Sequence, residues 1–328
     1  MMPTQLTVGR LFCRPRAWLA LLLAVSAFGC RSLSREPWET APLPPAGVEV
    51  TRLQSGPLLN IDRVRFWFAE MQEPRFFLAL VPAGVSTVTR VLVLNHGWAD
   101  RPEDLLRELR IAEVYTAMLS AGEVEPAIIV LPDVRFPDSY RRNADDYPFG
   151  QFLPLVAEDV AGHVAKTYGV PPDPARWGVA GFSFGGFVAL DIVRRYSGRF
   201  GHASVVSTFF DEEWAFWPAE PPPPGRLDSR GRGKQTVVVP GPVPRLLLAC
   251  GTEDRMYGSM TTLHDRLTAK RIPHEWNTSP GGHTWQYWSS VLRPILAFHL
   301  GTSRDSEARR DWFAPGSGGS GAVAEGSR

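Results

Sequence analysis

Cysteine is scarce in this sequence. Its 328 residues contain only Cys13, Cys30 and Cys250, and the first two lie in an N-terminal segment with the composition of an export signal. No disulfide can be built from the one cysteine that remains. The folded part must therefore be stabilised by its hydrophobic core, which a chain of this length can supply. Cys250 ends the apolar run LLLAC at 246–250, and we expect it to be a small buried residue and not a nucleophile.

An excess of charge of one sign is also absent. The formal net charge is +1, and no run of Lys and Arg is interleaved with aromatic residues, so the sequence predicts no nucleic-acid partner. The sequence has no His-x-x-x-His pair, no cysteine pair and no glycine-rich phosphate loop after an expected strand. We therefore expect neither a metal ion nor another cofactor.

The N-terminal hydrophobic run is too short to span a bilayer comfortably. It covers residues 17–28, AWLALLLAVSAF, and follows three arginines, which is typical of an export signal. Cys30 follows it after one glycine, as at the site where bacterial lipoproteins are cleaved and lipidated, although Phe28 stands where a small residue is usual. Lipidation at Cys30, ordinary signal cleavage and an uncleaved anchor all remain open. All three export the protein, and we expect a membrane-anchored lipoprotein that faces the periplasm or the cell surface.

Composition divides the chain into four parts. Residues 1–30 are the expected signal peptide, 31–47 a Pro-rich linker, 48–301 a single folded domain, and 302–328 a tail without periodicity that is expected to be disordered.

Short apolar runs alternate with helical patterns inside the domain. A run without polar positions, such as AIIVL at 127–131, is typical of a strand covered on both faces of a parallel sheet. The sequence thus predicts an α/β domain with a mainly parallel central sheet flanked by helices, and with antiparallel strands at its N-terminal edge. Strands are expected at 48–53, 64–69, 75–81, 90–95, 127–131, 177–181, 203–207, 246–250 and 275–278, and helices at 102–120, 152–168, 184–196, 260–271 and 287–300.

One segment, 209–244, breaks this alternation. It is rich in Pro, Trp and Phe and predicts no regular element. Long loops in compact domains are often lids, so the segment is either a cap over an active site or a surface insertion. Trp214 and Trp217 within it, and Trp98 outside it, could stack on sugars or aromatic acids, or simply pack against the domain.

The sequence GFSFG at 181–185 fits the pattern Gly-x-Ser-x-Gly. An apolar run leads into it and a helical pattern follows it, which is the setting of a sharp strand-to-helix turn that lifts a serine above the sheet. Glycines on both sides are needed because side chains there would collide with neighbouring elements. We therefore expect Ser183 to be a nucleophile, close to a helix N-terminus that favours negative charge.

A serine nucleophile needs a base, and the base needs a carboxylate that orients it. In a fold with this turn, the order along the chain is Ser, acid, His. His283 lies on the glycine turn SPGGH after the last expected strand, where the loop can reach Ser183, whereas His264 and His299 fall in helical patterns. For the acid we prefer Asp254, directly after the strand at 246–250, since ligands collect at such strand ends. Glu253 and Asp211 are alternatives.

An oxyanion formed during acyl transfer needs two backbone N–H donors. One is expected at Phe184, directly after the nucleophile. The second is expected in the loop NHGW at 95–98, from Gly97 or Trp98, since a glycine there lets the backbone approach a substrate closely. His96 is expected to be structural.

Together, NHGW, GFSFGG, CGTED and SPGGHTWQYW resemble the esterase family of the α/β-hydrolase superfamily that includes esterase D, enterochelin esterases and feruloyl and acetyl-xylan esterases. The resemblance spans roughly residues 60–300 and implies an α/β-hydrolase fold with a triad at Ser183, Asp254 and His283. It also implies that Trp285 and Trp288 support the histidine loop. The segments 136–150 and 209–244 depart from the family pattern and leave the substrate open.

These observations predict an exported serine carboxylic-ester hydrolase that acts through an acyl-enzyme on a small-molecule or carbohydrate ester. Two alternatives stay open. In an acyltransferase of the same fold, an alcohol replaces water. In a catalytically inactive member, the fold serves as a surface binding module.

Overall fold

The computed structural model describes residues 36–44, 47–85, 88, 90–135, 152–210 and 241–301. The expected signal peptide, Cys30, the tail, and most of the segments 136–150 and 209–244 lie outside these residues. All described residues belong to one compact unit.

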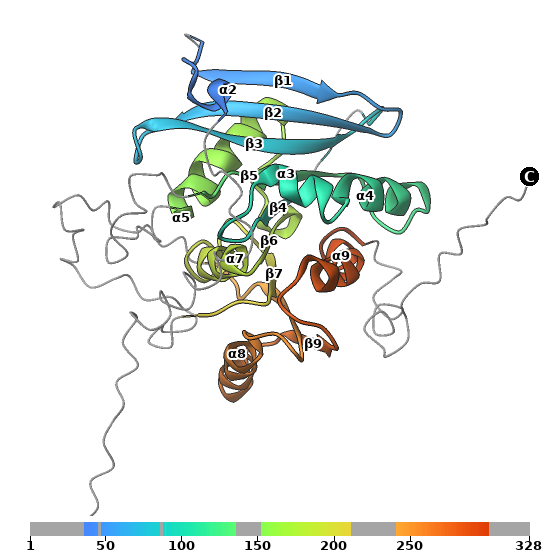
Figure 1. The fold of residues 1–328 in the computed structure, drawn as a ribbon. Coiled ribbons are helices and arrows are strands. Elements are labelled where there is room, and N and C mark those ends of the chain that lie inside the picture. The colour runs from blue at the N-terminus through green and yellow to red at the C-terminus, as the bar shows by residue number, and fades with distance from the viewer. Residues whose placement is uncertain are drawn as a thin grey trace, which may run out of the picture. The chain divides into compact units, whose positions relative to one another are not determined.

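A nine-stranded sheet forms the centre of the described part (Figure 1). Its strands lie in the order β1-β2-β3-β5-β4-β6-β7-β8-β9. They are β1 (Val48–Gln54), β2 (Leu59–Phe68), β3 (Glu73–Pro82), β4 (Arg90–Asn95), β5 (Ala127–Pro132), β6 (Trp177–Phe182), β7 (His202–Val206), β8 (Arg245–Gly251) and β9 (Glu275–Ser279). Strands β1 to β3 pair antiparallel, β3 pairs antiparallel with β5, and all pairs from β5 to β9 are parallel. The predicted fold class is confirmed, including its antiparallel edge.

Helices cover both faces of this sheet. One face packs against α3 (Pro102–Arg107), α4 (Ile111–Ser120) and α9 (Trp285–Leu300), which share a hydrophobic cluster with alternate strand residues such as Leu92 and Leu94 of β4. The other face packs against α7 (Phe184–Arg195), and α8 (Tyr257–Ala269) contacts β8. All six residues of β5 and all six of β6 are buried, as expected for strands covered on both sides.

Two predicted helices are interrupted in the structure. Residues 102–120 form α3 and α4, because Arg110 adopts a left-handed conformation (φ 50°) between them and Leu109 turns into the core. Residues 152–168 form α5 (Phe152–Pro154), a π-helical turn η5 (Leu155–Val160) and α6 (Ala161–Tyr168). A short 3₁₀ turn, η6 (Pro174–Arg176), precedes β6.

The region 31–47, expected to be a linker, contains the short helix α2 (Pro37–Thr40). Its Glu39 is buried and accepts hydrogen bonds from Arg135 at 2.8 Å and from Arg101 at 3.2 Å. Arg135 also donates to Asp133 at 2.7 Å. Burial alone would raise the pKa of Asp133, but the Arg135 charge and the other partners hold it well below its usual value. These ion pairs fix α2 against the end of β5.

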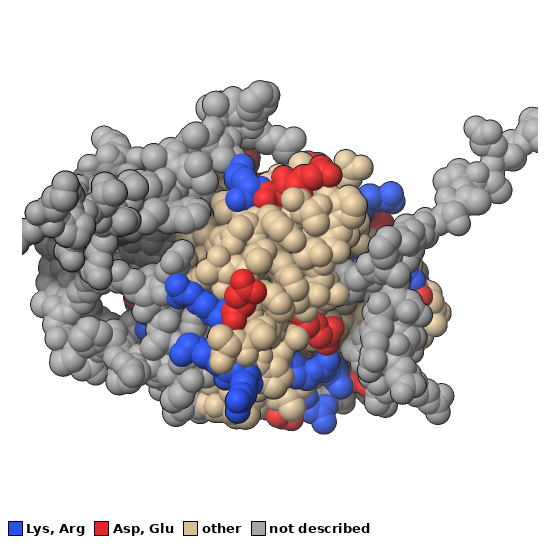
Figure 2. Space-filling model, turned by 90° about the horizontal axis from the view of Figure 1, so that it is seen from below, with Lys and Arg blue, Asp and Glu red and all other residues tan. Residues whose placement is uncertain are grey.

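Charges of both signs mix on the surface of the described residues. In Figure 2, Lys and Arg side chains lie among Asp and Glu side chains around a broad uncharged area. Within the described ranges, no helix is long and apolar enough to cross a membrane, and no group of three His, Cys, Asp or Glu side chains is placed to hold a metal ion.

Candidate active site

Ser183 lies in the sharp turn between β6 and α7. Its backbone has φ 55° and ψ −122°, a strained conformation for a residue with a side chain. The flanking glycines explain how the turn is possible. A Cβ on Gly181 would lie 2.1 Å from the carbonyl oxygen of Gly185, and one on Gly185 would lie 2.3 Å from that of Asn95. The structure therefore has the strand-turn-helix geometry that the motif predicted.

His283 lies beside this serine. Its Nε2 atom is 2.9 Å from the Ser183 hydroxyl oxygen, and its Nδ1 atom is 3.0 Å from each carboxylate oxygen of Asp254. Gly281, with φ 144°, permits the loop to turn after β9. The three side chains selected from the sequence thus form one hydrogen-bonded line. His283 follows Ser183 by 100 residues and Asp254 by 29, so the fold of the sheet brings them together.

 

Asp254 is held by further contacts. It is 5 % exposed, and its Oδ1 atom accepts a hydrogen bond from the backbone N–H of Met256 at 2.8 Å. Burial alone would raise the pKa of this carboxyl, but its hydrogen bond to His283, the charge of that imidazole and the Met256 N–H lower it below its usual value. The carboxylate is therefore ionised near neutral pH and can orient the imidazole. Glu253, the alternative acid, is exposed, and Asp211 lies outside the described residues.

The aromatic residues of α9 support the histidine loop. Trp288 packs edge-on against His283, with ring centroids 5.1 Å apart, and Trp285 packs edge-on against Trp288 at 5.0 Å. The Thr284 hydroxyl caps the helix by accepting a hydrogen bond from the Tyr287 N–H. The loop that carries the imidazole therefore ends in a rigid helix start.

The loop after β4 passes next to the serine. A Cβ on Gly97 would lie 3.7 Å from the Cβ of Ser183, so the loop backbone is close to the hydroxyl. His96, which is fully buried, fixes this loop. Its Nδ1 atom is 2.7 Å from the Gly97 carbonyl oxygen, and its Nε2 atom accepts a hydrogen bond from the Val134 N–H at 3.1 Å. These two bonds match a neutral ring that donates from Nδ1 and connects the loop to the end of β5.

The other residues considered from the sequence have different positions. Cys250 is fully buried, and burial, with Asp254 nearby, raises the pKa of its thiol to about 12, which leaves it protonated. Trp98 packs edge-on against Phe184, with ring centroids 5.4 Å apart. Trp214 and Trp217 lie outside the described residues.

Sequence reasoning missed Asp100. A Cβ on Gly97 would lie 2.4 Å from the Asp100 Oδ2 atom, which places this carboxyl at the same loop. The signal that could have found it is its position three residues after Gly97, in a turn closed by the Asp100 N–H and the Gly97 carbonyl at 3.3 Å.

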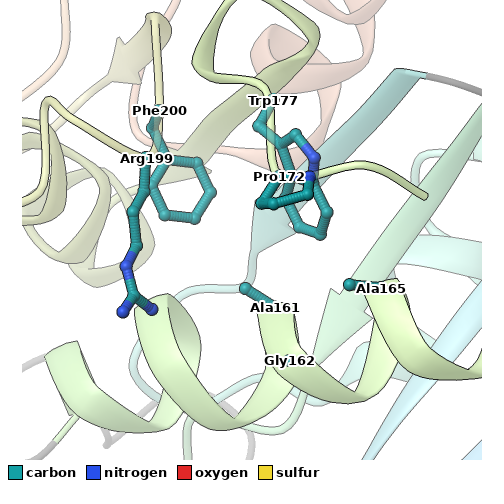
Figure 3. A pocket seen from close by; sticks show the side chains of 7 residues that line it. All are labelled: Ala161, Gly162, Ala165, Pro172, Trp177, Arg199 and Phe200. Carbon is teal, nitrogen blue, oxygen red and sulfur yellow. The ribbon is translucent and has the colours of Figure 1, made fainter.

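A separate hollow lies at the other end of β6 (Figure 3). It has a volume of about 280 Å³, with Arg199 and Phe200 on one side, Pro172 and Trp177 on the other, and α6 below. Trp177 is the first residue of β6, whereas Ser183 follows the last one, so about 20 Å of strand separates the hollow from the serine. It plays no part in the arrangement around Ser183.

Comparisons with known proteins agree with this arrangement. The family described as "Putative esterase" matches residues 69–299. Among solved structures, the fluorophosphonate-binding serine hydrolase F of Staphylococcus aureus has a TM-score of 0.57 at 17% identity, over 75% of this chain and 100% of the other. A ferulic acid esterase from Anaeromyces mucronatus, in complex with ferulic acid, has a TM-score of 0.57 at 19% identity, over 76% and 91%. S-formylglutathione hydrolase from Staphylococcus aureus has a TM-score of 0.52 at 14% identity, over 79% and 99%. At these identities the solved structures establish the shared fold.

Proposed function

The chain belongs to the "Putative esterase" family and is a carboxylic ester hydrolase, and from this premise we propose that it works by a Ser183–His283–Asp254 triad through an acyl-enzyme. The observation that carries the proposal is the continuous line of contacts from serine to imidazole to carboxylate, at 2.9 and 3.0 Å. These are the distances that proton transfer between a nucleophile and its base requires.

The reaction follows from the positions of these atoms. The Ser183 oxygen forms a bond to the ester carbonyl carbon, and its proton passes to Nε2 of His283. The ester C–O bond then breaks, and the same proton goes to the leaving alcohol. Water attacks the acyl-enzyme by the reverse route, which releases the acid and restores the serine. Asp254 holds Nδ1–H and stabilises the imidazolium that forms in each step.

The oxyanion of each tetrahedral intermediate needs N–H donors near Ser183. The Phe184 N–H, at the start of α7, is one candidate. For the second, the orientation of the Gly97–Trp98 peptide favours Trp98 over Gly97. The carbonyl of this peptide points to His96, and the N–H of a trans peptide points the opposite way. The Gly97 backbone forms a hydrogen bond with the Asp100 carboxyl instead.

We propose that the substrate is a small-molecule or carbohydrate ester. The ferulic acid complex of the Anaeromyces mucronatus esterase makes aromatic acid esters a first choice for testing. A panel of 4-nitrophenyl acetate to palmitate, methyl ferulate, acetylated xylan and a catecholate siderophore ester would rank the acyl groups. Turnover that disappears in Ser183→Ala supports the proposal. Full turnover in that variant refutes it.

Export and anchoring are part of the same proposal. The short apolar run at 17–28 followed by Cys30 supports lipidation at this cysteine. Expression of the full chain and of Cys30→Ala in a bacterium, followed by membrane fractionation and mass analysis, tests it. We expect a diacylglycerol adduct on Cys30 and release of the variant from the membrane fraction. An unmodified Cys30 in the membrane-bound protein would contradict lipidation.

A further inference from the structure

Asp100 places a carboxyl group beside the catalytic serine. The position that a Cβ on Gly97 would occupy is 2.4 Å from Asp100 Oδ2 and 3.7 Å from Ser183 Cβ, so the last two atoms are at most about 6 Å apart. The charge that His283 carries when it is protonated acts on this carboxyl. Asp100 is only partly buried, and so it can meet a substrate at the serine.

Within the described part of the chain, this carboxyl lacks an Arg or Lys partner. No Lys or Arg among the described residues forms an ion pair with Asp100, whereas the nearby Asp104 pairs with Arg107. Burial, followed by the charge of Asp104, raises the pKa of Asp100, against the lowering effect of the Gly97 backbone hydrogen bond and of His283. A partly buried carboxylate usually has a basic partner, and one that lacks an Arg or Lys partner among the described residues and lies beside a reactive serine is a candidate for substrate contact.

The turn itself does not require a charge at this position. The Asp100 N–H bonds to the Gly97 carbonyl at 3.3 Å, and the carboxyl accepts a hydrogen bond from the Gly97 backbone. An asparagine side chain could accept the same hydrogen bond and close the same turn. The turn at 97–100 therefore does not require the negative charge of Asp100.

We propose that Asp100 determines substrate specificity: its carboxylate favours esters that carry a cationic group or a hydrogen-bond donor within a few bonds of the scissile carbonyl, and disfavours anionic ones. This inference rests on the proposed function of Ser183. At a separation of 6 to 8 Å and the effective dielectric constant of a protein surface, one unit charge changes kcat/KM on the order of tenfold.

Charge-matched substrates test this directly. On the alcohol side, we would compare butyrylthiocholine, its neutral analogue with carbon in place of nitrogen, and the anionic S-(2-carboxyethyl) thiobutyrate. On the acyl side, we would compare 4-nitrophenyl 4-(trimethylammonio)butyrate, its neutral carbon analogue and 4-nitrophenyl hydrogen glutarate. Asp100→Asn removes the charge and keeps the turn. Glu113→Gln removes one exposed charge on α4 as the matched control.

At pH 8 and low salt, the wild type and Glu113→Gln should prefer the cation over the anion in at least one series. Asp100→Asn should reduce that ratio about a hundredfold, about tenfold through each charged ester, with less than a threefold change for the neutral ester. An unchanged ratio in both series overturns the proposal. An equal fall in kcat/KM for the cationic, neutral and anionic esters also overturns it, because it would mean that Asp100 only shapes the loop.

A second measurement, the rate of covalent modification of Ser183, does not depend on turnover. The rates at which a cationic phosphonylthiocholine and its neutral carbon analogue modify Ser183 should differ in the wild type, and should become alike in Asp100→Asn. Modification at equal rates in the wild type refutes the role of Asp100 while Ser183 remains the nucleophile. No modification of Ser183 by either reagent refutes the proposed function, and the role of Asp100 with it.

Discussion

Mild acid should destabilise this fold through a buried histidine pair. His202 of β7 and His299 of α9 have their Nδ1 atoms 2.7 Å apart, and the Ser204 hydroxyl lies 2.8 Å from Nε2 of His299. A hydrogen bond between the two Nδ1 atoms needs one donor and one acceptor, so the contact is lost when both rings are protonated. Burial, with Arg245 and Arg90 nearby, lowers the pKa of His202 to about 4. Burial and the neighbouring His202 lower the pKa of His299 well below its usual value.

The size of the effect follows from the difference in histidine pKa between the folded and unfolded states. A histidine in the unfolded chain has a pKa of about 6.5. Between this pH and about 4, the unfolded state therefore binds protons that the folded state does not, and the free energy of unfolding falls as the pH falls. From pH 7.5 to 5.0, the loss is about 2 kcal/mol for each histidine, or about 4 kcal/mol for the pair. This is a large part of the ~5–15 kcal/mol that stabilises a typical domain.

Denaturant unfolding at pH 7.5 and 5.0 measures this loss in the wild type and in His202→Gln. Glutamine leaves a neutral hydrogen-bonding group near His299 and removes one titrating group. All other titrating groups are common to both proteins, so their contributions cancel in the comparison. The loss of stability between the two pH values should be smaller by about 2 kcal/mol in the variant. The same loss in both proteins would refute the reasoning.

Two further substitutions probe the site itself. Asp254→Asn leaves the shape but removes the charge that stabilises the His283 imidazolium, so kcat for 4-nitrophenyl acetate should fall by roughly 10²- to 10⁴-fold without loss of the fold; a change of less than threefold would argue against Asp254 as the acid. Gly185→Ala would place a Cβ 2.3 Å from the Asn95 carbonyl oxygen, and we expect it to destabilise the domain by more than about 2 kcal/mol in denaturant unfolding. The helical Gly258 has open space around its Cβ position, so Gly258→Ala is the control, with stability unchanged or raised by up to about 1 kcal/mol; equal effects of the two alanines would contradict the steric account.

The strands could be predicted from the sequence because buried strands consist of apolar residues. Runs such as those at 91–94 and 127–131 contain only apolar residues, and each proved to be a strand covered on both faces. The order of the strands is not visible in this way. β4 lies between β5 and β6 because of crossover connections, and no local pattern encodes these.

Breaks within helices were harder to predict. Arg110 precedes α4 in a left-handed conformation, which glycine or asparagine usually adopts. Leu109 is buried at this break, and the helical pattern at 102–120 continues across it, so the sequence pattern does not reveal the break.

Some residues of the candidate site could likewise be predicted from the sequence, and others could not. Ser183 and the residues around it could be predicted, because the turn demands glycines at fixed positions. His283 and Asp254 followed from chain order and from their places after strands. Asp100 could not be found, since its closeness to the serine depends on how the turn at 97–100 closes. The family resemblance implied that Trp288 supports the histidine loop, and its ring does pack against that of His283.

The most direct test of the account is the site at which a fluorophosphonate modifies the folded protein. The purified 31–328 fragment would be treated with the reagent, digested and analysed by mass spectrometry, together with Ser183→Ala and His283→Ala. The account predicts one adduct, on Ser183, absent from the first variant and formed far more slowly in the second. An adduct on another residue, or none on Ser183 in the folded wild-type protein, would contradict it.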